Sequence, residues 1–275
     1  MKHYGTQAGL SLVELMVALA ISSFLILGVT QIYIDNKRSY SFQQNLAENQ
    51  EGSRYTLLLL QQELAKAGYR RRPDVPFDEA FPANNALGCS FAKGQTAKQF
   101  STTQNAVCIR YQPHNPLERD CLGNLPVNAA AIDTTPYTDA GETIVERLFL
   151  DGNTLMCQTA HVTSSTKTAG PGELVSGIAD LRFEFGVGTA SNDRRVNKYI
   201  AAPDGPVLTI RYTALMRSSN INLRDGIDID TALLNWRNLT GISTEDTLLA
   251  DLKTADRGNL YQISQSAVML RNLLP

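Results

Sequence analysis

The longest hydrophobic stretch of the chain covers residues 10–34 and contains one charged side chain, Glu14. It has no proline, lysine or arginine, and the polar residues 35–38 (DNKR) follow it. At 1.5 Å per residue a helix of this length measures about 37 Å, whereas the hydrocarbon core of a bilayer is about 30 Å thick. The pattern therefore predicts a membrane-spanning helix over 10–34.

Apolar residues recur at helical spacing after this stretch. Residues 39–67 contain no proline and are rich in Gln, Glu, Leu and Ala. We expect the helix to continue over 35–68, to bend at Gly52 and to stop at Gly68, because glycine commonly ends helices. One face of this second half is expected to pack on a sheet. Its apolar stripe consists of Leu57, Leu60, Leu64 and Ala67.

The rest of the chain carries strand patterns separated by polar segments. Residues 73–136 are rich in Asn, Pro, Gly, Thr and Gln and are expected to form loops. Asp151-Gly152 between two β-rich runs predicts a hairpin. Residues 221–256 are interpreted as an excursion with a short helix over 231–236. The expected strands cover 106–111, 143–150, 154–159, 179–187, 207–216 and 261–271.

These elements predict an α+β fold. A long N-terminal helix packs on an antiparallel β-sheet, and the globular domain over 69–275 includes a long loop region with disulfides. With 275 residues and 43% apolar content, the chain is long enough for one large domain with an appendage.

Four cysteines lie in the middle of the chain, and no CxxC pair occurs. In an exported domain an even number of cysteines predicts disulfides, here two bonds with three pairings open. The alternatives are a zinc site completed by His114 or His161, which lacks closely spaced ligand pairs, and free cysteines in the core. The disulfide candidates are Cys89, Cys108, Cys121 and Cys157.

Neither the charge nor the motifs of the sequence indicate a catalytic, metal-binding or nucleic-acid-binding site. The formal net charge of −2 does not favour nucleic acid, and only three histidines occur. The motifs GxSxG, Walker A, HExxH and GxGxxG are missing from the sequence. The acidic residues 225–230 lack the EF-hand pattern and are expected to form a solvated loop, as are the arginines 70–72. We therefore predict no catalytic residues, no metal site and no cofactor.

The N-terminus resembles the signal of type IV prepilins. A short leader, residues 1–9, ends in Gly9, an apolar run follows, and Glu14 is the fifth residue after the glycine. The resemblance implies cleavage between Gly9 and Leu10 by a prepilin peptidase on the cytoplasmic face, and N-methylation of Leu10. The family most often has phenylalanine at the position of Leu10. Ordinary signal cleavage after residues 18–20 is disfavoured, because it leaves a mostly apolar segment on the mature chain.

The resemblance also gives Glu14 a partner. Cleavage creates an amino group on Leu10, at the i, i+4 spacing that places it on the same helix face as Glu14. Pairing of the two charges, within one chain or with a neighbouring subunit, stabilises a carboxylate in a poorly solvating environment. The alternative is a glutamate that only extends toward the membrane surface. We therefore predict a role of Glu14 in subunit assembly.

Two further segments resemble PilW-type minor pilins. Residues 173–186 are similar to a turn and central strand of minor pilins, and 257–272 are similar to the last strand of PilW-type subunits and of J-type pseudopilins of type II secretion. The resemblance implies a structural subunit that primes type IV pilus assembly, sits at the tip, and supports twitching motility and adhesion. The implied partners are other minor pilins, the major pilin, a large tip adhesin, prepilin peptidase, the inner-membrane assembly platform and, before assembly, membrane lipid.

Positive charge at Lys2 and His3 favours a cytoplasmic N-terminus, although Lys37 and Arg38 follow the span. The predicted location is therefore a single-pass inner-membrane protein with a periplasmic C-terminal domain, and then the pilus fibre. The alternatives are a minor pseudopilin of a type II secretion system and a membrane-anchored periplasmic enzyme or binding module.

Overall fold

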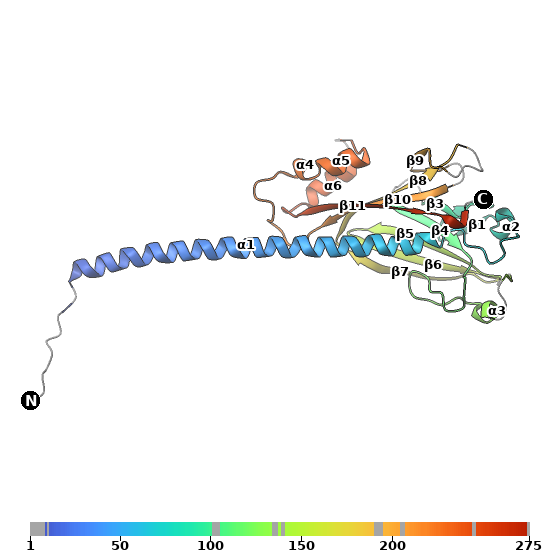
Figure 1. The fold of residues 1–275 in the computed structure, drawn as a ribbon, viewed down its shortest axis with the longest axis horizontal. Helices are drawn as coiled ribbons and strands as arrows, with labels where there is room; N and C mark the ends of the chain where they lie inside the picture. The colour runs from blue at the N-terminus through green and yellow to red at the C-terminus, as the bar shows by residue number, and fades with distance from the viewer. Residues whose placement is uncertain are drawn as a thin grey trace, which may run out of the picture.

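The computed structural model describes residues 9, 11–100, 105–133, 137–138, 141–189, 195–203, 207–243 and 246–273. Its dominant element is α1 (Leu12–Ala65), a helix of 54 residues. The first half of α1 extends away from the rest of the molecule, and the second half lies along the globular domain (Figure 1).

Helix α1 ends close to the predicted place, since Gly68 has a φ of +75°, a conformation that glycine adopts readily. The soft point or bend predicted at Gly52 does not interrupt α1, which continues through this residue. Gly52 instead permits a close approach to the sheet: a Cβ at this position would lie 3.2 Å from Met216 Cε.

The strands form two larger antiparallel sheets and one small hairpin, where the sequence predicted one sheet. The five-stranded sheet has the order β3 (Ala97–Gln99), β4 (Ala106–Tyr111), β5 (Thr143–Asp151), β6 (Thr154–Val162) and β7 (Lys167–Ser176). The four-stranded sheet has the order β11 (Tyr261–Met269), β10 (Val207–Arg217), β8 (Ile178–Val187) and β9 (Lys198–Ile200). The hairpin pairs β1 (Asn84–Ala86) with β2 (Cys89–Phe91).

All six expected strands are present, and the Asp151-Gly152 turn joins β5 to β6 as predicted. Strand β7 was missed because Gly170, Pro171 and Gly172 interrupt its pattern, and glycine and proline weaken strand signals. The α+β class and the packing of a long N-terminal helix on antiparallel strands are confirmed.

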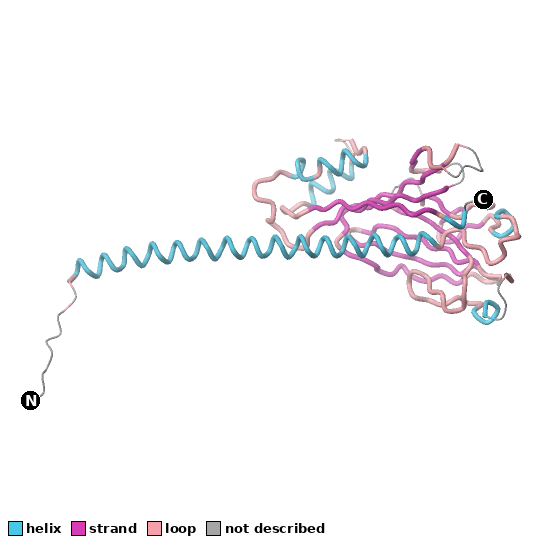
Figure 2. The backbone as a smooth tube through the Cα atoms, in the orientation of Figure 1, coloured by secondary structure: helices cyan, strands magenta, loops and turns pink. Residues whose placement is uncertain are grey.

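The main core lies between the two sheets and the second half of α1. Leu60, Leu64 and Ala67 pack there against both sheets, as the apolar stripe predicted. Their neighbours include Val107, Leu148, Leu155, Phe183, Phe185, Ile210 and Tyr212. Figure 2 shows the strands gathered around the second half of the helix and leaving its first half bare.

Short helices occupy the connections. The excursion between β10 and β11 forms α4 (Ile229–Ala232), α5 (Leu234–Thr240) and α6 (Thr247–Ala255). Trp236, Leu249 and Leu252 of this excursion pack on Leu215 of the four-stranded sheet. The remaining ones are α2 (Phe77–Ala80), α3 (Ala129–Asp133) and η1 (Arg271–Leu273).

Candidate assembly helix and its attachment to the domain

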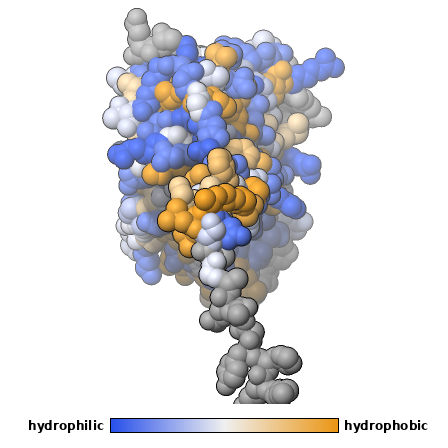
Figure 3. Space-filling model, turned by 90° about the vertical axis from the view of Figure 1, so that its left-hand side faces the viewer, coloured by the Kyte–Doolittle hydropathy of each residue, from blue (hydrophilic) through white to orange (hydrophobic). Residues whose placement is uncertain are grey.

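The first half of α1 carries a continuous apolar surface. Every large hydrophobic side chain over 12–34 is exposed, from 49% at Ile34 to 78% at Phe24. Among the described residues, α1 is the one helix that is long and apolar enough to cross a membrane. No part of its most apolar stretch is buried against the domain. Seen along the helix from its free end, the hydrophobic side chains gather in the centre of a largely hydrophilic face (Figure 3).

Two hydroxyls in this half are satisfied by the helix itself. Ser23 Oγ donates to the carbonyl of Leu19 at 2.8 Å, and Thr30 Oγ1 donates to that of Ile26 at 2.7 Å. Hydroxyls bonded in this way do not need water. The first half of α1 is therefore suited to an apolar environment, and it fits membrane anchoring.

Glu14 lies in the first turn of α1 and is exposed. Its Oε2 accepts the backbone N–H of Ser11 at 2.9 Å. A carboxylate at this position satisfies an otherwise unpaired N–H and is favoured by the helix dipole. Gly9 is exposed, whereas Leu10 and residues 1–8 lie outside the described part of the chain. The pairing of Glu14 with a new amino group on Leu10 remains a prediction.

The contact between α1 and the domain begins with polar side chains. Asn45, Asn49, Ser53 and Thr56 are buried on one face of the helix. Asn45 Oδ1 accepts the backbone N–H of Asn220 at 3.2 Å, and Ser53 Oγ is hydrogen-bonded to Ser264 Oγ. The sequence analysis missed this stripe, although its spacing of four, four and three residues matches a helix face.

The end of α1 is fixed by hydrogen bonds from distant parts of the chain. Tyr212 of β10 donates its hydroxyl to the carbonyl of Leu57 at 3.1 Å. Asn272 donates to the carbonyls of Ala65 and Ala67 at 3.1 and 3.2 Å. The last carbonyls of a helix lack partners within it, so the bonds from Asn272 hold the helix end in place, and the bond from Tyr212 ties the preceding turns to β10.

A buried charged cluster surrounds the last turn of α1. Glu146 of β5 is 0% exposed, and its Oε1 accepts the hydroxyl of Tyr111 at 2.7 Å and the N–H of Cys121 at 3.1 Å. Lys66 Nζ lies 3.9 Å from Glu146 Oε1 and pairs closely with Glu63. Burial, with repulsion from Glu63, raises the pKa of Glu146 to about 8. Burial therefore favours the protonated form of Glu146, and the closest ion pair of Lys66 is the one with Glu63.

All four cysteines are paired, so the zinc and free-cysteine alternatives do not apply. The bond between Cys89 and Cys108 joins β2 to β4, and the bond between Cys121 and Cys157 joins the loop after β4 to β6. Both bonds lie in or beside the loop-rich region, where little apolar material is available to hold the chain.

His161 fixes the same loop by a second means. Its Nδ1 lies 2.7 Å from Glu142 Oε1, and its Nε2 lies 3.0 Å from Asp120 Oδ2. Because both ring nitrogens face carboxylates, the doubly protonated imidazolium fits best. Burial alone would lower the pKa of His161, but the hydrogen bonds to Asp120 and Glu142 outweigh burial and raise this pKa to about 9.

Two buried arginines organise the loops around these cross-links. The expectation of a solvated turn at 70–72 is wrong for Arg71, which is 5% exposed. Arg71 donates to the carbonyls of Pro113, His114, Ile132 and Thr138. Arg110 donates to the carbonyls of Phe81, Pro82, Ala92 and Gln95. A guanidinium has five N–H donors, so one arginine side chain can donate hydrogen bonds to several loop carbonyls that are not paired in a sheet.

The acidic residues 225–230 have partners within the chain. Asp225 pairs with Arg38 at 3.1 Å, Asp228 accepts the N–H of Thr231 at 2.9 Å, and Asp230 pairs with Lys253. Within the described ranges, no group of three or more histidine, cysteine or acidic side chains is placed to hold a metal ion.

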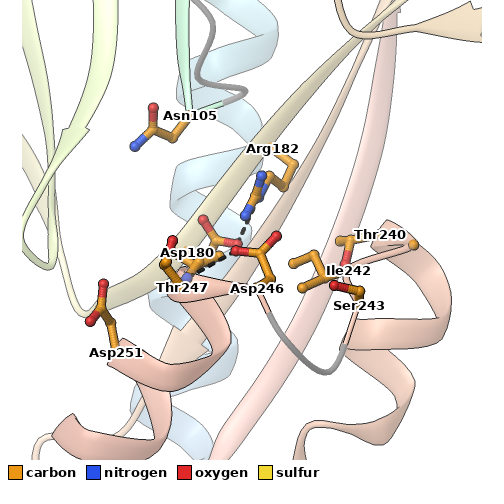
Figure 4. Close-up of a pocket in the computed structure, with 11 residues that line it drawn as sticks. Asn105, Asp180, Arg182, Thr240, Ile242, Ser243, Asp246, Thr247 and Asp251 are labelled. Atoms are coloured by element: carbon orange, nitrogen blue, oxygen red, sulfur yellow. Dashed lines mark hydrogen bonds and ion pairs between the residues drawn. The ribbon is translucent and has the colours of Figure 1, made fainter.

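One cleft of about 620 Å³ lies between α5, α6 and the four-stranded sheet (Figure 4). Asp180 is buried in it and pairs with Arg182 at 2.8 Å. Burial raises the pKa of Asp180, and Arg182 opposes this rise. Asp246 points to the same cleft but caps α6 by accepting the N–H of Leu248 at 2.9 Å. These carboxylates thus have structural partners.

Comparison with known proteins gives matches at both ends of the chain. Residues 142–272 match the family model of type IV pilus-assembly protein W, and residues 5–30 match the prokaryotic N-terminal methylation motif. Among solved structures, a type IV-like pilin from Thermus thermophilus aligns with a TM-score of 0.43 and 12% identity, over 83% of this chain and 98% of that chain. No curated protein matches the chain in sequence.

The methylation motif lies over the leader and the bare half of α1, and the second match spans β5 to β11. The family is structural and not enzymatic. Together, the two matches on one chain support a type IV pilus minor pilin that is similar to PilW.

Proposed function

We propose that this minor pilin primes pilus assembly and takes a place in the tip complex, supporting twitching motility and adhesion. The leader 1–9 is removed, Leu10 is methylated, and residues 10–34 hold the mature chain in the inner membrane. The domain over 69–275 then faces the periplasm. The observation that carries the proposal is the bare apolar half of α1 on a domain that holds the other half firmly.

The mechanism is physical. Extraction of the helix from the membrane would expose its apolar side chains to water. The helices of other minor pilins and of the major pilin bury these side chains instead. Apolar burial contributes about 25 cal/mol per Å². Glu14 then pairs with the amino terminus of its own chain or of a neighbouring subunit. The prepilin peptidase, the assembly platform in the inner membrane and a large tip adhesin are the other expected partners.

The test is a deletion strain complemented with variants of this chain. Glu14→Ala should leave the protein in the membrane at the wild-type level but reduce surface pili to the level of the deletion strain. Glu51→Ala removes an exposed carboxylate from the second half of the same helix and should restore pili fully. Normal pilus numbers with Glu14→Ala would contradict the proposal. A deletion strain with normal pili and blocked protein secretion would instead place the chain in a type II secretion system.

A further inference from the structure

A loop of the domain reaches back to the place where the apolar half of α1 ends. Asp225 pairs with Arg38 at 3.1 Å, and Asn220 bonds to Asn45 farther along the helix. Arg38 follows Ile34, the last residue of the apolar run, by four positions. At 1.5 Å per residue, Asp225 therefore lies about 6 Å beyond the apolar surface of the helix.

This loop, residues 219–228, exposes two isoleucines. Ile221 is 53% exposed and Ile227 is 54% exposed. The neighbouring carboxylates are compensated from within the chain: Asp225 pairs with Arg38, and Asp228 accepts both the N–H and the hydroxyl of Thr231. The loop thus presents apolar side chains whose charged neighbours already have partners.

The membrane geometry brings lipid to the same level. The headgroup layer adds about 5–7 Å on each side of a hydrocarbon core of about 30 Å. A loop about 6 Å beyond the apolar run therefore lies at headgroup depth. The run itself is longer than the core is thick, and such a helix accommodates by tilting. Tilting toward the loop lowers Ile227 further into this layer.

We propose that the loop 219–228 rests on the bilayer while the chain is stored in the membrane, with Ile227 inserted at the interface and Ile221 beside it. The inference depends on the membrane storage in the proposed function. It gives the domain a fixed orientation before assembly, because the helix and the loop contact the same membrane surface. Extraction then has to lift the loop as well as the helix. Lipid is favoured as the occupant because the span itself holds the loop at this depth.

The experiment uses the full chain with native disulfides, reconstituted in phosphatidylcholine vesicles. Ile227→Trp reports on the loop, and Leu117→Trp is the matched control, because Leu117 is also exposed, at 75%. Leu117 belongs to the loop whose His114 bonds to Tyr69, past the end of α1 and about 40 Å farther from the span. The native Trp236 is 0% exposed and gives a constant background.

Two quenchers distinguish the environments. Brominated phosphatidylcholine should remove most of the Ile227→Trp signal and leave the Leu117→Trp signal unchanged, whereas iodide in the buffer should do the opposite. Equal iodide quenching of both variants, in a chain that floats with the vesicles, would overturn the loop contact alone. Iodide protection that rises with protein concentration, without bromolipid quenching, would overturn it in favour of a second subunit. A chain that fails to float would overturn the membrane storage itself.

Discussion

The two halves of α1 differ in what surrounds them: the apolar half is exposed, whereas the other half is bound to the domain and buries polar side chains. The half over 12–34 is almost wholly apolar, yet every large side chain in it is exposed. The half from Asn45 onward is bound to the domain, yet its contact begins with buried Asn, Ser and Thr side chains. The apolar half is therefore left for partners outside this chain, which in the proposed function are lipid and other helices. The polar half instead matches one domain in one register.

The physical reason lies in the directionality of hydrogen bonds. Apolar surface packs favourably against many partners, because the hydrophobic effect is non-directional. Asn45 and Ser53 have defined partners in Asn220 and Ser264, and a shifted helix would leave these groups buried without partners. In the proposed function, the apolar half of α1 can therefore exchange partners during assembly, while the other half keeps the domain attached.

The largest expected effect is a difference in the free energy of unfolding when one leucine is truncated in each half. Leu64→Ala should reduce the free energy of unfolding by about 2–5 kcal/mol, because it opens a cavity in the core. Leu25→Ala, at a residue that is 64% exposed, should change it little in detergent. Denaturant unfolding followed by Trp236 fluorescence measures both. Equal losses would show that the halves do not differ in this way.

The second effect concerns pH, since ionisable groups surround the end of α1 and its neighbouring loop. His161, with a pKa raised to about 9 from 6.5, stabilises the fold fully below pH 6.5, and this contribution is lost as the pH rises through 9. The shift corresponds to at most about 3 kcal/mol. Glu146, whose pKa is raised to about 8 from 4.5, acts in the same direction: its contribution is fully present below pH 4.5 and is lost as the pH rises through 8.

Unfolding midpoints should therefore fall between pH 6 and pH 9.5. His161→Gln should flatten this fall, whereas His114→Gln, at an exposed histidine, should leave it unchanged. A midpoint that rises with pH over this range would contradict the assigned charge states of His161 and Glu146.

The third effect probes the polar stripe directly. Asn49 donates to the carbonyl of Leu260, which also accepts the N–H of Ser218. Asn49→Ala should therefore cost only about 1 kcal/mol, the net value of one hydrogen bond. Gln44→Ala, at an exposed position on the same helix, is the matched control. A stabilised Asn49→Ala variant would show that the stripe does not hold the helix.

The smallest effect is expected at the boundary between the halves. Arg38 and Asp225 form an ion pair in which both side chains are more than half exposed. Arg38→Gln should change the free energy of unfolding by at most about 0.5 kcal/mol, because exposed pairs contribute little. Thermal unfolding at low and high salt measures this change. A loss of stability comparable to that of Leu64→Ala would contradict the claim that the exposed ion pair contributes little.

Local patterns predicted most of the fold. The strand β4 over 106–111 has the predicted bounds, and Leu60, Leu64 and Ala67 are buried as their spacing indicated. Patterns of this kind succeed because an apolar face must find an apolar neighbour, whichever it is. They do not specify how strands divide into sheets, so the single predicted sheet is two.

The missed features of the helix attachment and the loops are buried polar groups. Arg71 and His161 have the residue types of solvent-exposed positions, and their partners lie far away in the sequence. Asn49 shows the same property on α1. Burial of such groups depends on partners that only the folded chain brings together. Leader cleavage at Gly9 and the role of Glu14 remain predictions from the motif.

The most direct test of α1 as a processed assembly helix is the mass of the mature N-terminus in cells with and without the prepilin peptidase. A chain that begins at methylated Leu10 only when the peptidase is present is the predicted result. It would place a positive charge one helical turn from Glu14. A chain that begins at Met1 or Lys2 in both strains would contradict the assembly role of α1 and leave a membrane-anchored domain.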